Sequence, residues 1–126
     1  MAATTGNASK TIVQYVVVRS DLLTELNWPV GAVIAQACHA CTAALKLFGD
    51  DVNTIAYTEN LDSMHKVVLA APTETKLLAL CEALRDASID YKLWIEQPEN
   101  IPTCVATKPY PKADVQTFFK GFKLFK

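Results

Sequence analysis

The order of its apolar segments predicts that this chain forms a single α/β domain. Runs at 11–19 and 65–72 are β-branched with little polar interruption, which is typical of strands buried on both faces. Two further strands are predicted at 89–95 and 104–110. Helical patterns lie between these strands, and this alternation favours a four-stranded mixed sheet with helices on both faces.

An alanine-rich stretch at 31–48 predicts the first helix, after a loop at 20–30 that contains Asn27, Trp28 and Pro29. Apolar side chains recur in it at intervals of three and four residues, which predicts a buried stripe. The expected members of this stripe are Val30, Ile34, Ala37, Cys38, Cys41, Leu45 and Phe48.

Three more helices are expected. Residues 50–62 predict a short one, and residues 73–88 predict another that begins after Thr73, whose hydroxyl suits a helix cap. The last helix is expected at 112–122, beyond Pro109 and Pro111.

The composition is that of one ordinary domain, since 126 residues that are 51% hydrophobic can bury a core without disulfides or metals. We expect the domain to span 11–126, after a disordered lead-in at 1–10. This lead-in has no apolar core for secretion and no arginine for mitochondrial import, which favours the cytoplasm. The longest apolar runs are too short to cross a bilayer, so no membrane span is predicted.

The four cysteines lie among apolar neighbours, which favours reduced thiols over a disulfide framework. Cys38 and Cys41 form a CxxC pair around His39, which could serve a redox or zinc site. A redox pair usually opens its helix, whereas this pair lies two turns inside one. Small core residues are the better interpretation, and no metal or other cofactor is predicted.

Polar residues gather where the predicted strands end, the edge at which α/β proteins bind ligands. Asp21 follows the first strand, Gln36 and His39 share one face of the first helix, and Glu96 ends the third strand. Thr103 stands at the mouth of the fourth strand. Each has a plainer interpretation: a surface histidine for His39, a polar turn for Glu96 and a loop-backbone hydrogen bond for Thr103.

Positive charge is concentrated near the C-terminus, because residues 108–126 hold five lysines and one aspartate. Lys66, Lys108 and Lys112 are candidate phosphate contacts. A solvated helix face gives the same pattern about as often, so the charge is weak support for a nucleic-acid partner.

Several linked motifs resemble the type-two peptidyl-tRNA hydrolase family. They are YVVVRSDL, then GAVIAQACHA, then HKVVLAAP with TETKLLAL after it, and their order and spacing match over about 12–126. The ending LWIEQPENIPTCVATKPYPK is closer still to the divergent eukaryotic proteins described as peptidyl-tRNA hydrolase domain-containing.

The resemblance implies hydrolysis of the ester between a peptide, or an N-blocked amino acid, and tRNA, with no metal. By matching positions it implies catalytic roles for His39, Glu96 and Thr103. Asp21, Gln36 and Lys66 also match motif residues and are expected to bind substrate. Lys108 and Lys112 join them as expected substrate-binding residues because of their charge. Gly31 also matches a motif residue.

Two departures separate this chain from the family pattern. Ala32 stands where the family has a lysine, and the loop EQPENIP is shorter than the family's glycine-rich loop. Removing one electrostatic stabiliser typically lowers a rate by about 10² to 10³. A second hypothesis therefore stays open, namely a binding module for tRNA or protein without catalysis. A homodimer is also compatible with the sequence.

Overall fold

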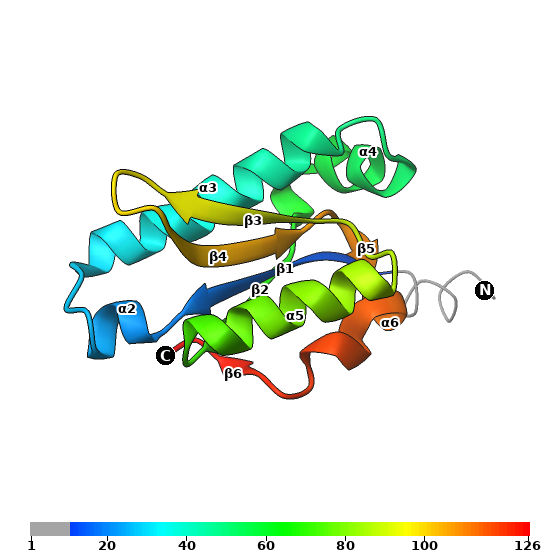
Figure 1. Cartoon of the computed structure of the whole chain (residues 1–126). Coiled ribbons are helices and arrows are strands. Elements are labelled where there is room, and N and C mark those ends of the chain that lie inside the picture. Colours follow the sequence, from blue (N-terminus) through cyan, green and yellow to red (C-terminus); the bar gives the residue numbers. More distant parts are fainter. Residues whose placement is uncertain (1–10) are drawn as a thin grey trace.

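One central sheet organises the computed structural model, which describes residues 11–126 (Figure 1). The lead-in expected at 1–10 lies outside the described residues. The sheet order is β3-β4-β1-β2-β6, with β5 paired to β1. The strands are β1 (Ile12–Arg19), β2 (Lys66–Ala71), β3 (Tyr91–Glu96), β4 (Ile101–Thr107), β5 (Tyr110–Pro111) and β6 (Lys123–Leu124).

The predicted α/β class and mixed sheet are confirmed. The pair β1 and β2 is parallel, and the other strand pairs are antiparallel. The described residues form six strands rather than four, because β5 and β6 add two residues each at the margins. Strand β4 also begins three residues earlier than predicted, since Ile101 pairs with Glu96 at the start of its ladder with β3.

Helices cover both faces of this sheet, with α3 on one side and α5 on the other (Figure 1). Thr73 caps α5 as predicted, because its hydroxyl accepts a hydrogen bond from the Lys76 N–H at 3.1 Å. The α-helices are α2 (Asp21–Thr24), α3 (Val30–Leu47), α4 (Val52–Glu59), α5 (Glu74–Asp86) and α6 (Lys112–Val115), and the 3-10 turns are η1 (Leu61–Ser63) and η2 (Gln116–Phe119).

Two helix predictions need correction. The loop expected at 20–30 contains the single turn α2, and the last helix stops as an α-helix at Val115 and continues only as η2. Phe119 within η2 is buried and stacks on Tyr15 of β1, with ring centroids 4.1 Å apart. Docking of this ring on the sheet accompanies the tighter 3-10 turn.

Strand β1 separates two apolar clusters, as its uninterrupted sequence predicts. Val13, Tyr15 and Val17 pack toward α5 and η2, whereas Val16 and Val18 pack toward α3. Even Gln14 is fully buried, and its amide donates to the carbonyls of Cys41 and Thr107.

The predicted buried stripe of α3 is correct at Cys41 and wrong at Val30, Ile34 and Cys38. Val30 and Ile34 are 62% and 59% exposed, and Cys38 is exposed as well. The helix is apolar nearly all round, so apolar spacing does not determine which side packs. Small side chains let the backbone approach the sheet, and the buried residues are Val33, Gln36, Ala40, Cys41 and Ala44.

Within residues 11–126, α3 is the one helix long and apolar enough to cross a bilayer by length and composition. The prediction of no span considered only uninterrupted apolar runs and overlooked it. A core helix of a globular domain passes the same test, and α3 packs against β1, β3 and β4.

The helix phase can be tested with a matched pair of substitutions. Val33→Ala should lower the free energy of unfolding by about 2 kcal/mol, because it removes buried methyl groups. Val30→Ala should change it by less than about 0.5 kcal/mol, because Val30 is mostly exposed. Urea denaturation measures both, and equal losses would contradict the observed phase.

Candidate functional site

The predicted ligand-binding edge brings several of the candidate residues together. The end of β1, the turn between β3 and β4, and the first turns of α3 gather at one end of the sheet (Figure 1). Strand β4 runs antiparallel to β1, so its beginning, with Thr103, lies at the same end as Glu96. Gln36 reaches this edge from the second turn of α3.

A chain of hydrogen bonds connects Thr103, Gln36 and Glu96. The Thr103 hydroxyl donates to Gln36 Oε1 at 2.7 Å, and Gln36 Nε2 donates to Glu96 Oε2 at 3.2 Å. The second Nε2 hydrogen goes to the Ala32 carbonyl at 3.1 Å. Thr103 and Gln36 are 0% and 1% exposed, so these two side chains position Glu96 from below the surface.

An irregularity in the β3–β4 ladder aims Thr103 at Gln36. Trp94 pairs with Cys104 and Ile95 with Pro102, which leaves Thr103 as an extra residue on β4. Cys104 already packs toward α3, so regular alternation would send Thr103 to the opposite face. A bulge of this kind re-aims one side chain.

Trp94 is a site residue that the sequence analysis missed. Its indole Nε1 donates to Glu96 Oε1 at 3.0 Å, and its ring stacks on His39 with centroids 4.5 Å apart and planes 12° from parallel. The signal was available, because residues two apart on a strand share a face and Trp94 precedes Glu96 by two. The Trp94 ring thus contacts both His39 and Glu96.

These contacts keep the Glu96 carboxylate ionised. The hydrogen bond from Trp94 lowers the pKa of Glu96 most, the bond from Gln36 lowers it further, and the nearby His39 charge adds to this. Burial raises the pKa by less, so the net pKa lies below its ordinary value of 4.5. Both carboxylate oxygens thus have fixed donors while the group remains partly exposed.

Asp21 is held by Arg19. The guanidinium forms a two-pronged pair with its carboxylate, at 3.0 and 2.8 Å, and also donates to Glu74 and to the Pro102 carbonyl. Arg19 is buried and therefore braces β1 against the start of β4, beside Thr103. Both carboxylate oxygens of Asp21 thus accept hydrogen bonds from this guanidinium.

The three candidate lysines lie at the other end of the sheet. Lys66 is opposite Gln14 near the start of β1 and donates to its Oε1 at 2.6 Å, and Lys112 binds the Thr11 carbonyl through its backbone N–H. Lys108 is 8% exposed and paired with Asp51 and Asp90 at 2.6 and 3.3 Å. Because this buried ammonium group is already paired with two carboxylates, it is poorly placed to contact a phosphate.

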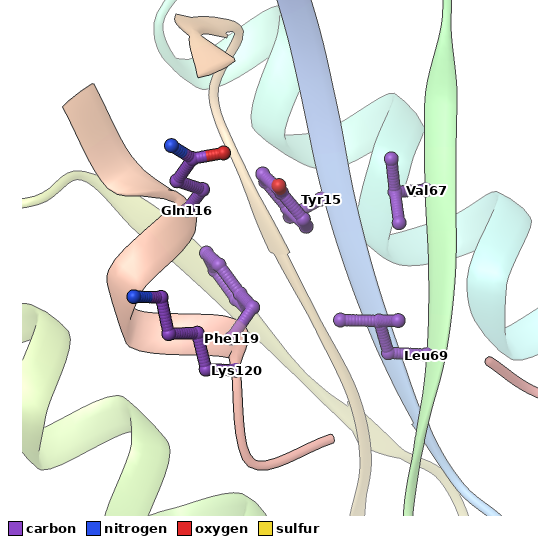
Figure 2. Close-up of a pocket in the computed structure, with 6 residues that line it drawn as sticks. All are labelled: Tyr15, Val67, Leu69, Gln116, Phe119 and Lys120. Carbon is purple, nitrogen blue, oxygen red and sulfur yellow. The ribbon is translucent and has the colours of Figure 1, made fainter. Parts of the chain in front are cut away.

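A separate hollow lies on the opposite face of the sheet (Figure 2). Tyr15 and Phe119 stand parallel in it, and burial raises the pKa of the Tyr15 phenol, which keeps it protonated. None of its lining residues is acidic or a histidine, so it offers no general base. The lining residues are Tyr15, Val67, Leu69, Gln116, Phe119 and Lys120.

The cysteines and metal-ligand groups add no second centre to the described residues. All four thiols are free, and burial raises the pKa of Cys41, which disfavours the reactive thiolate. Cys38 alone is exposed, against the expectation that it is a core residue. Across residues 11–126, no group of three or more His, Cys, Asp or Glu side chains is arranged to hold a metal.

Comparison with known proteins agrees with the motifs. The family model described as peptidyl-tRNA hydrolase PTH2 matches residues 12–125. The chain belongs to this family. The Glu96 carboxylate is held by Trp94 and Gln36, and Gln36 is held in turn by Thr103. We call this group the Glu96 clamp, and its geometry makes it the candidate site.

Relatives and a solved structure extend the comparison. The human and mouse proteins named "Putative peptidyl-tRNA hydrolase PTRHD1" are each 51% identical over 125 residues, which cover 98% of this chain and 89% of each relative. A solved protein of unknown function, Atu0240 from Agrobacterium, has a TM-score of 0.63 at 13% identity and covers 92% of this chain and 98% of its own. The relatives confirm the predicted resemblance to the divergent eukaryotic branch, and the solved structure supports the fold alone.

Thr103→Val tests the positioning chain. It leaves the buried Gln36 Oε1 without its donor, so the free energy of unfolding should fall by about 1–3 kcal/mol. Looser Gln36 should also let the pKa of Glu96 rise toward 4.5. A carboxyl NMR titration measures the pKa, and Thr103→Ser should restore both values. An unchanged Glu96 pKa in Thr103→Val would contradict the chain.

Proposed function

We propose that this PTH2 family member hydrolyses the ester that joins a peptide, or an N-blocked amino acid, to the 3′ end of tRNA. Family membership supports the reaction class. The observation that carries the proposal is the Glu96 carboxylate, which is held by two neutral donors at the ligand-binding edge of the sheet. A fixed, ionised acceptor at a surface is suited to holding a water molecule.

Glu96 orients the attacking water in this mechanism. Its free lone pairs accept a hydrogen bond from the water, while Trp94 and Gln36 prevent the carboxylate from turning. A carboxylate with a lowered pKa is a weak proton acceptor, so its contribution is orientation and electrostatic stabilisation. The water oxygen adds to the ester carbonyl and forms a tetrahedral intermediate.

His39 takes the proton that the water loses and returns it to the departing ribose oxygen. An imidazole is the side chain suited to this exchange near neutral pH, and stacking on Trp94 fixes this one beside Glu96. Collapse of the intermediate breaks the ester bond and frees the peptide acid and the tRNA. Thr103 acts through Gln36, because its hydroxyl proton is already donated there.

Basic side chains at the far end of the sheet would contact the tRNA body. Lys66 and Lys112 are exposed, whereas Lys108 is not, so the proposal keeps only the first two as phosphate contacts. Such contacts release counterions, and binding should weaken as salt is raised.

Glu96→Gln should reduce hydrolysis of an N-blocked aminoacyl-tRNA by at least about 10², because the charge that orients the water is removed. Single-turnover release of tRNA measures the rate. Glu99→Gln in the exposed turn is the matched control and should retain the parental rate. An unchanged rate in Glu96→Gln would remove Glu96 from the mechanism. No turnover by the parent protein, with tRNA binding intact, would instead support a binding module.

The pH dependence follows from the lowered pKa of Glu96. The carboxylate stays ionised above about its ordinary pKa of 4.5, so its titration should not limit the rate at any higher pH. The stability it adds is complete above pH 4.5 and is lost as pH falls through the lower folded-state pKa. Denaturation of the parent and Glu96→Gln at several pH values measures this difference, which should shrink only below pH 4.5.

Ala32→Lys tests the missing family lysine. Position 32 lies one helical turn before Gln36, so an ammonium there would stand near the Glu96 clamp. The added charge should raise the single-turnover rate by about tenfold or more, because it stabilises the developing oxyanion. Ala32→Gln is the uncharged control. A folded lysine variant no faster than the parent would show that this site works without that charge.

A further inference from the structure

A surface hollow begins beside the Glu96 clamp and runs along α3 and β3 toward the C-terminal end of the helix. Its walls are mostly apolar, with the paired rings of His39 and Trp94 and an ammonium from Lys46. The lining residues are Cys38, His39, Thr42, Ala43, Lys46 and Trp94. We call it the α3–β3 hollow. The proposed hydrolysis uses His39 at one end of it and leaves the rest unassigned.

The two rings form a rigid platform. His39 and Trp94 are 12° from parallel at 4.5 Å, and the indole cannot rotate freely because its Nε1 is bonded to Glu96. His39 is exposed, so the ring pair is open to a flat ligand from the solvent side. Aromatic platforms of this kind bind unpaired nucleobases by stacking.

Positive charge continues along the same track. Lys46 is exposed at the far end of the hollow, and Lys92 precedes Trp94 by two residues and so projects from the same face of β3. Among the described residues neither ammonium is in an ion pair, in contrast to Lys108. A platform followed by two unpaired ammonium groups matches a base followed by backbone phosphates.

We propose that the α3–β3 hollow binds the nucleobase of the 3′-terminal nucleotide of tRNA, with Lys46 and Lys92 on the adjoining phosphates. This inference rests on the proposed function, because it places the ester at Glu96. The base and the ester are attached to the same terminal ribose, so the base must lie within about one sugar ring of the reacting carbonyl. The ring pair lies next to Glu96, because the Trp94 indole both donates a hydrogen bond to Glu96 and stacks on His39.

The test uses RNA that carries no ester, so binding is measured whether or not the protein hydrolyses anything. A short single-stranded RNA ending in adenosine is compared with the same RNA ending in an abasic nucleotide, which keeps every phosphate. Trp28→Phe leaves Trp94 as the one tryptophan, and quenching of its fluorescence reports occupation of the hollow. Loss of the terminal base should weaken binding by about fivefold or more.

Two substitutions at His39 separate stacking from proton transfer. His39→Ala should remove the preference for the adenosine-ended RNA, whereas His39→Phe should keep it, because the ring remains. Hydrolysis should fall in both variants. His39 is exposed, so neither change should unfold the protein, which circular dichroism checks. Equal binding of the two RNAs by the parent, or an unaltered preference in His39→Ala, would overturn the proposal.

Lysine variants test the phosphate track. Lys46→Ala should reduce the slope of log affinity against log salt by about 1, the contribution of one phosphate contact. Lys120→Ala removes the same charge from the hollow on the opposite face of the sheet and should leave the slope unchanged (Figure 2). Equal effects of the two variants would reject the track.

The outcomes for the hollow and for the hydrolase are distinguishable. Base-dependent binding without turnover would support the hollow and contradict the proposed enzyme. Turnover together with RNA binding that does not depend on the terminal base would support the enzyme and would show that the hollow does not bind the nucleobase. Turnover that depends instead on the side chain of the blocked amino acid, with no base preference, would overturn the proposal in favour of the peptide.

Discussion

The amide of Gln36 is the interaction that fixes α3 on the sheet. It is buried, and its three hydrogen bonds join the Ala32 carbonyl, Glu96 and Thr103. A buried amide that loses its partners destabilises a fold by about 1–3 kcal/mol for each unsatisfied group. Rotation of α3 by one position would break the bonds to both strands, whereas its apolar side chains would tolerate the change. The hydrogen bonds of the buried Gln36 amide therefore determine which face of α3 packs on the sheet, although the helix is apolar nearly all round.

The same constraint determines where an ionised group can stand. Glu96 occupies the end of β3, where one donor comes from its own strand and the other from the helix. On the neighbouring strand β4, the bulge at Thr103 and the hydrogen bond from Arg19 to the Pro102 carbonyl fix the start of the strand beside Glu96. Strand β3 and helix α3 thus supply both side-chain donors to the carboxylate, so its orientation is fixed before any ligand binds.

Charge is distributed unequally around this edge. The family lysine is absent at position 32, and the sequence-predicted cations Lys66, Lys108 and Lys112 lie toward the start of β1. Lys46 lines the same hollow as the ring pair, and Lys92 shares one face of β3 with Trp94. In the function proposed above, the ester site would thus lie beside a strip formed by the two rings and these ammonium groups.

The sequence by itself determined the α/β class, the order along the chain of the four long strands and of α3, α4 and α5, the Thr73 cap and the family. These depend on local pattern and on linked motifs, which are readable along the chain. Only the tertiary structure decided the phase of α3, the union of His39 with Glu96 through Trp94, and the burial of Lys108 between two aspartates. These features depend on contacts between residues far apart in the chain and on a bulge that breaks strand alternation. Neither can be predicted from apolar periodicity.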